Sequence, residues 1–167
     1  MQTHRSSTSW RQQALIEASP EAVWELVGDP NRYPEWTADV AKVTGLPHVA
    51  EGATFQRVGM TPEGTRTLTF QIDEREELRS IRLRCLDTNT YTRFSLTRAR
   101  GGTFIDIETG TDSPGLWDRA LDATKRKRFF RDLVNRTVDG LRDELTKSGR
   151  AGTADWRESG PENTKTA

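Results

Sequence analysis

Three basic residues occupy positions where the surrounding pattern favours an apolar side chain. In the stretch ATFQRVGM, Phe55 marks the buried face of a strand, and Arg57 shares that face because side chains alternate along a strand. Arg66 shares the face of Leu68 in the next strand, and Lys127 interrupts an apolar helical stripe. Cations in an apolar interior can orient a ligand or polarise a carbonyl group, so these three are the candidate catalytic residues.

Two interpretations of Lys127 stay open. Its ammonium group can snorkel to the surface on its methylene groups, or it can reach a cavity mouth and neutralise an anionic or enolate oxygen of a ligand. The surrounding segment KRKRFFR (125–131) is interpreted as a solvated helix face, with a basic docking patch as the alternative.

The other reactive residue types are few or are predicted to face water. The sequence has no phosphate-binding or dinucleotide-binding glycine motif, no HExxH, no GxSxG and no cysteine pair. His4 stands in a terminal segment and His48 in a loop, so we expect no metal site and no cofactor. Asp106 and Glu108 alternate with isoleucines, so their side chains are predicted to face solvent. The alternation in the strand around Tyr91 predicts that its side chain faces solvent as well.

The composition favours a single globular domain. The chain has 167 residues, of which 33% are hydrophobic and 30% charged, and its formal net charge of zero argues against a nucleic-acid partner. The lone Cys85 excludes an intramolecular disulfide and is predicted to be a core residue. No apolar run approaches the roughly 18 residues of a membrane span, and the first nine residues lack an apolar signal segment, so we expect a cytoplasmic protein.

The periodicity of apolar residues predicts the order of the elements. Segments 1–9 and 148–167 are small and polar and are predicted to be disordered, which leaves a folded domain over 10–147. Ser19 and Pro20 are typical of a helix start, and Gly28 to Pro30 of its end. A helical turn is expected at 31–36 and a long amphipathic helix from 113 to 147. Strands are expected at 10–18, 38–45, 54–60, 65–74, 80–86, 91–98 and 103–111.

This order, together with three stretches of sequence, resembles the START-like (SRPBCC) superfamily, in its polyketide cyclase/dehydrase and lipid-transport branch. The stretches are IEASPEAVWELVGDPNRYPEW, the glycine-led EGATF, and FFRDLVNRTVDGLRDEL. The resemblance implies an α+β helix-grip fold, in which a curved antiparallel sheet wraps around the long C-terminal helix and leaves a cavity between them. The segment Tyr33-Pro34-Glu35-Trp36 would then close one end of the gap, and the alternative, compatible interpretation is that Trp36 caps the core.

The resemblance implies a carrier that binds a small hydrophobic ligand, such as a polyketide, lipid, isoprenoid or quinone. The residues expected to bind it are Trp36, Phe55, Arg57, Phe70, Phe94, Trp117, Phe130 and Val134. Two alternatives stay open. One is an aromatic polyketide cyclase/dehydratase that uses Arg57, Arg66 and Lys127. The other is a protein-binding module with a vestigial cavity, and a homodimer or another protein partner is compatible with the sequence.

Overall fold

The computed structural model describes residues 9–61, 64–112 and 123–149. Seven strands form one antiparallel sheet, with bounds β1 Ser9–Ile16, β2 Val40–Thr44, β3 Thr54–Thr61, β4 Gly64–Glu76, β5 Ser80–Cys85, β6 Thr90–Ala99 and β7 Gly102–Thr111. The helical elements are α1 Pro20–Val27, η1 Pro30–Arg32, α2 Tyr33–Trp36 and α4 Ala123–Lys147. The predicted tails and the first third of the predicted long helix lie almost entirely outside the described residues.

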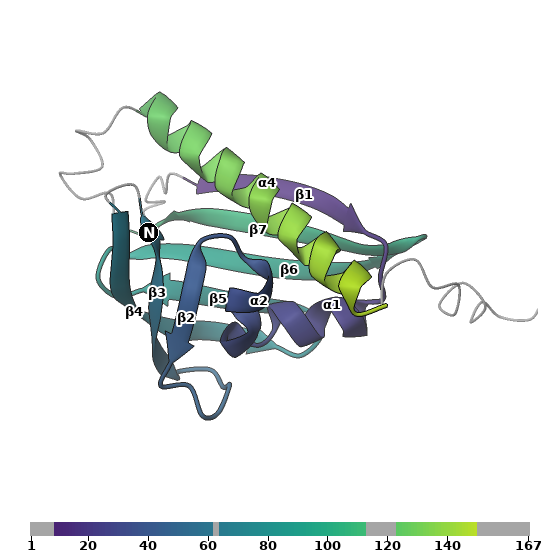
Figure 1. Ribbon diagram of the computed structural model, residues 1–167, viewed down its shortest axis with the longest axis horizontal. Helices are drawn as coiled ribbons and strands as arrows, with labels where there is room; N and C mark the ends of the chain where they lie inside the picture. The colour runs from purple at the N-terminus through teal and green to yellow at the C-terminus, as the bar shows by residue number, and fades with distance from the viewer. Residues whose placement is uncertain (1–8, 62–63, 113–122, 150–167) are drawn as a thin grey trace, which may run out of the picture.

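The sheet is an open antiparallel meander, and the first strand of the chain forms one of its edges beside the last strand. Its order is β1-β7-β6-β5-β4-β3-β2, so each later strand pairs with its neighbour in sequence and β1 pairs with β7. Figure 1 shows α4 crossing β1 and β7, with α1 and α2 beside it on the same face of the sheet. This arrangement confirms the predicted helix-grip fold. No helix among the described residues is long and apolar enough to cross a membrane.

The broken helical segment after β1 follows from its capping residues. The Ser19 hydroxyl accepts a hydrogen bond from the Ala22 amide at 3.2 Å, and Pro20 occupies the first turn, where its missing N–H costs no helical bond. The helix ends at Gly28, as predicted. Asp29 then caps η1 by accepting from the Asn31 amide, so the chain turns directly into α2.

The strand register assigns each side chain to one of two faces. The helix-facing side carries the apolar core, including Ile72, Ile81, Leu83, Ile105 and Ile107. A bulge between Ile72 and Glu74 shifts the alternation in β4, so Arg75 faces the helices. Its guanidinium donates to the Gly28 carbonyl at 3.2 Å and lies over the Trp24 ring. The simple alternation of the sequence did not predict this arginine.

A glycine in the middle of α4 sets the distance between α4 and α2. A Cβ atom at Gly140 would overlap the carbonyl oxygen of Trp36, so the two backbones touch at this point. A residue with a side chain would force the elements apart. The contact seats the end of α2 against α4 and holds the Trp36 side chain in the core, where it is 3% exposed.

The outer face of the sheet carries paired charges. Arg82 forms ion pairs with Asp73 and Asp112, and its guanidinium lies 4.2 Å from the centre of the Tyr91 ring. The Tyr91 hydroxyl donates to Glu108 at 2.6 Å. Tyr91 is thus on the predicted outer face but is only 7% exposed, because Arg82 covers it.

We expect Gly140→Ala to destabilise the protein by about 1–3 kcal/mol, the usual cost of overpacking. The same change in an unobstructed helix would stabilise it, because alanine has the higher helix propensity. Urea unfolding measures the difference, and Asp143→Ala at an exposed position of α4 is the control, with an expected change near zero. A Gly140→Ala variant as stable as the wild type would contradict the close contact.

We expect Tyr91→Phe to cost about 1–2 kcal/mol near neutral pH, because it removes the hydrogen bond to Glu108. Burial, followed by the bond to Glu108, raises the pKa of Tyr91 to about 12, above the ~10 of an unfolded tyrosine. This contribution is therefore complete below about pH 10 and is lost as the pH rises towards 12. Urea unfolding across this range should show the wild type losing stability faster than Tyr91→Phe, whereas parallel curves would contradict the assignment.

Candidate functional site

Three aromatic side chains meet where α2 approaches the sheet. Trp36 lies edge-on to Tyr33, with ring centres 5.2 Å apart, and both contact Phe94 of β6 at 6.0 Å. The Tyr33 hydroxyl donates to the Val27 carbonyl at 2.8 Å, and burial raises the pKa of this phenol. Tyr33 is therefore a structural residue that stays protonated, and Trp36 and Phe94 are the two members predicted to contact a ligand.

A second aromatic pair continues the helix-facing surface across β3 and β4. Phe55 stacks on Phe70, with ring centres 5.8 Å apart and planes inclined by 21°. Arg57 lies on the same face, with its guanidinium 4.1 Å from the centre of the Phe70 ring and 3.7 Å from the Asp39 carboxylate. The arginine is thus held by a cation–π contact and an ion pair while one-fifth of its side chain stays exposed.

The three candidate catalytic cations do not meet. Arg66 lies on the helix-facing side of β4, opposite Gly59 and diagonal to Arg57, but it is exposed. Lys127 is exposed as well, and its ammonium nitrogen lies 5.4 Å from the centre of the Trp10 ring on β1. Lys127 thus contacts β1, whereas Arg57 and Arg66 stand on β3 and β4, towards the other end of the strand order.

The remaining predicted ligand contacts come from α4 and the segment before it. Val134 is a core residue, 3% exposed. Phe130 is half-buried and packs edge-on against Phe129, with ring centres 5.6 Å apart. Trp117 lies outside the described residues.

Four buried polar atoms on the helix-facing side form no hydrogen bond within the described part of the chain. They are the indole nitrogens of Trp10, Trp24 and Trp36 and the hydroxyl of Thr111. Nearby, Gln12 of β1 donates to Asn135 of α4 at 2.8 Å, so it is satisfied within the fold. Sequence reasoning missed Trp10 and Thr111, although both stand at alternating positions of their strands and Trp10 pairs with Thr109. Buried donors without partners are uncommon and mark a place where a bound molecule can supply the acceptor.

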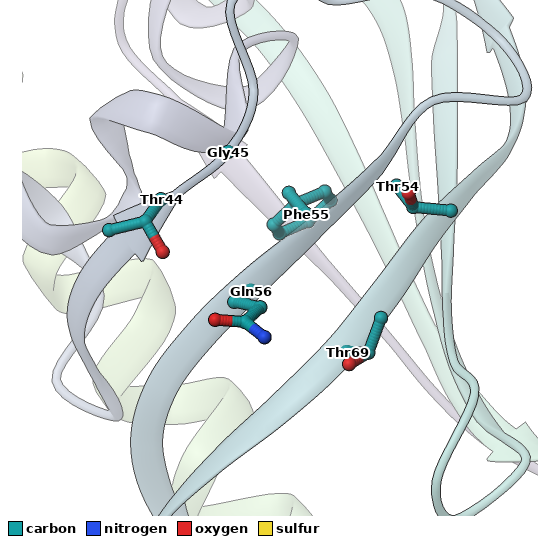
Figure 2. A pocket seen from close by; sticks show the side chains of 6 residues that line it. All are labelled: Thr44, Gly45, Thr54, Phe55, Gln56 and Thr69. Atoms are coloured by element: carbon teal, nitrogen blue, oxygen red, sulfur yellow. The ribbon is translucent and has the colours of Figure 1, made fainter.

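A pocket of about 250 Å³ opens elsewhere, on the outer face of β2, β3 and β4 (Figure 2). Thr44, Thr54, Gln56 and Thr69 line it with hydroxyl and amide groups, and Gly45 and Phe55 complete the lining. Phe55 is thus the one predicted ligand-binding residue that borders this pocket, although by register its ring is on the helix-facing side with Phe70. A second pocket of about 360 Å³ lies between the start of α1 and the turn from β4 to β5. Neither is the predicted ligand site between the sheet and α4.

Comparison with known proteins agrees with this architecture. Residues 7–146 match the model of a family described as polyketide cyclase/dehydrase and lipid transport. A START superfamily protein from Mycobacterium smegmatis aligns with a TM-score of 0.71 at 13% identity, covering 84% of this chain and 98% of that one. An AHSA1-like protein from Aeromonas hydrophila aligns with a TM-score of 0.63 at 15% identity, covering 87% and 97% of the two chains. Comparison with curated proteins gives no match.

Proposed function

This chain belongs to the polyketide cyclase/dehydrase and lipid transport family, and from that premise we propose that it binds a small hydrophobic molecule between the sheet and α4. The ligand classes that suit such a site are polyketides, lipids, isoprenoids and quinones. An α+β helix-grip fold suits this role because one face of the sheet and one face of the long helix are both apolar.

The observation that carries the proposal is the aromatic surface on the helix-facing side. Phe55, Phe70, Phe94 and Trp36 supply flat apolar area with little side-chain freedom to lose on binding. The Trp36 ring is 3% exposed and packs between Tyr33 and Phe94, so it belongs to the apolar part of this surface. Arg57, next to Phe70, supplies a polar group that orients the ligand.

Binding is favoured over turnover by the placement of the polar groups. A cyclase needs several polarising groups around one bound chain, and here Lys127 lies against Trp10 of β1 while Arg66 is exposed on β4. Tyr33 is engaged with the Val27 carbonyl and Arg57 with Asp39. We therefore propose a carrier or binding protein as the leading function.

Filling the site with a larger side chain tests the proposal. Thr92 faces the helices two residues before Phe94, so Thr92→Trp should occupy space that a ligand needs. We expect the wild type to bind the neutral apolar dye N-phenyl-1-naphthylamine with a rise in fluorescence, and Thr92→Trp to weaken that binding at least about tenfold. The matched control is Thr97→Trp, which adds the same side chain at an exposed position on the outer face of the same strand.

Thermal melting of each variant separates a filled site from a misfolded protein. If Thr92→Trp melts early, the smaller change Thr92→Leu replaces it, with a graded loss of dye binding expected. A wild type that binds no dye, or folded Thr92 variants that bind it as well as the wild type and Thr97→Trp, would overturn the proposal.

A further inference from the structure

We propose that the ligand is an amphipathic acid whose carboxylate binds at the β1–β7 end of the site, on Trp10, Thr111 and Lys127. This inference rests on the proposed function and specifies the ligand class. The apolar body of the acid lies towards Phe94 and Trp36. The indole N–H and the threonine hydroxyl donate to the carboxylate, and the lysine ammonium compensates its charge.

The geometry brings two unsatisfied donors to one place. Trp10 lies directly opposite Thr109 in the register between β1 and β7, and Thr111 is the next helix-facing residue along β7. Such diagonal neighbours stand about 7–8 Å apart on a sheet, so both side chains can reach one bound group. Thr111 is 6% exposed, and among the residues that the structure describes neither its hydroxyl nor the Trp10 indole nitrogen has a hydrogen-bond partner.

Lys127 provides the positive charge at the same end of the sheet. Its ammonium nitrogen lies 5.4 Å from the centre of the Trp10 ring and its side chain remains exposed, so it can reach a ligand head group at the edge of the site. Arg128 and Arg131 follow on α4, and Arg131 contacts Asp132 at 3.6 Å.

The distribution of charge over the whole sheet favours an anion. The acidic residues of the described strands all face outward, where most pair with arginines: Asp73, Glu74, Glu76, Asp106 and Glu108. The helix-facing positions of the same strands carry basic residues and no acidic ones: Arg57, Arg66, Arg75 and Arg98. A ligand carboxylate on this side therefore meets no repelling strand carboxylate.

The threonines beside Trp10 determine which end of the ligand lies at the β1–β7 end of the site. Thr92 pairs with Thr109 and Thr90 with Thr111, so this end of the surface is rich in hydroxyl groups. Phe94 lies two residues further along β6, about 7 Å away, and begins the aromatic region with Trp36. The polar end and the aromatic end match a molecule with one oxygen-bearing head and an apolar body.

Matched acids and alcohols test the head-group assignment. The dye N-phenyl-1-naphthylamine is displaced in parallel by dodecanoic acid and dodecan-1-ol, and by 2-naphthylacetic acid and 2-(2-naphthyl)ethanol, near pH 7.5. We expect at least one acid to displace the dye at a concentration about tenfold or more below that of its alcohol. In Lys127→Gln the acid should lose this advantage, whereas in the control Lys147→Gln, at the far end of α4, it should keep it.

Two conservative variants measure how much the neutral hydrogen-bond donors contribute to acid binding, apart from the charge of Lys127. Trp10→Phe keeps an aromatic ring without the N–H donor and Thr111→Val keeps the shape without the hydroxyl, so each should weaken acid binding about threefold to tenfold while thermal melting shows that the variant is still folded. Acids and alcohols that displace the dye equally would overturn the carboxylate proposal while leaving hydrophobic binding intact. An acid preference that survives in Lys127→Gln but disappears in Arg57→Gln would overturn the location. Absence of dye binding in the wild type would instead contradict the proposed function, which is the binding of a small hydrophobic molecule.

Discussion

The contact between the Gly140 backbone and the carbonyl oxygen of Trp36 fixes the arrangement on which the site depends. Because α4 has no side chain at this point, α2 can end directly against it and place Trp36 between Tyr33 and Phe94. The hydrogen bonds from the Gln12 amide to Asn135 and from the Arg142 guanidinium to the Leu15 carbonyl tie α4 to β1. The long helix is thus held against both α2 and β1, on the face of the sheet that carries the aromatic side chains.

The two faces of the sheet differ in how their polar groups are paired. On the outer face, arginines and carboxylates pair with one another, and Arg82 with Tyr91 and Glu108 forms a connected group that shields the strands. On the helix-facing side, the strand positions hold apolar, basic and neutral polar residues, and the donors of Trp10 and Thr111 have no hydrogen-bond partner within the described part of the chain. A polar group that the fold leaves without a partner is costly unless something binds it, which is why these atoms bear on function.

Much of the fold could be predicted from the sequence because local rules and tertiary structure agree. The alternation around Phe55 and Phe70 correctly placed Arg57 on their face, and the Ser19-Pro20 start and the Gly28 end of α1 follow from capping chemistry. Other features needed the assembled sheet. The bulge after Ile72 reverses the face of Arg75, the covering of Tyr91 depends on a neighbouring strand, and the role of Gly140 depends on a helix distant in sequence. Trp10 and Thr111 were missed because nothing local marks a buried donor as unsatisfied.

The central claim is that a small hydrophobic molecule occupies the space between the sheet and α4. Native mass spectrometry of the protein purified from its own host, followed by denaturing extraction, tests this most directly. The account predicts a mass increment of one apolar molecule per chain, which extraction then releases for identification. A protein that is empty as isolated, and whose melting temperature is unchanged by polyketide, lipid, isoprenoid and quinone panels, would contradict it.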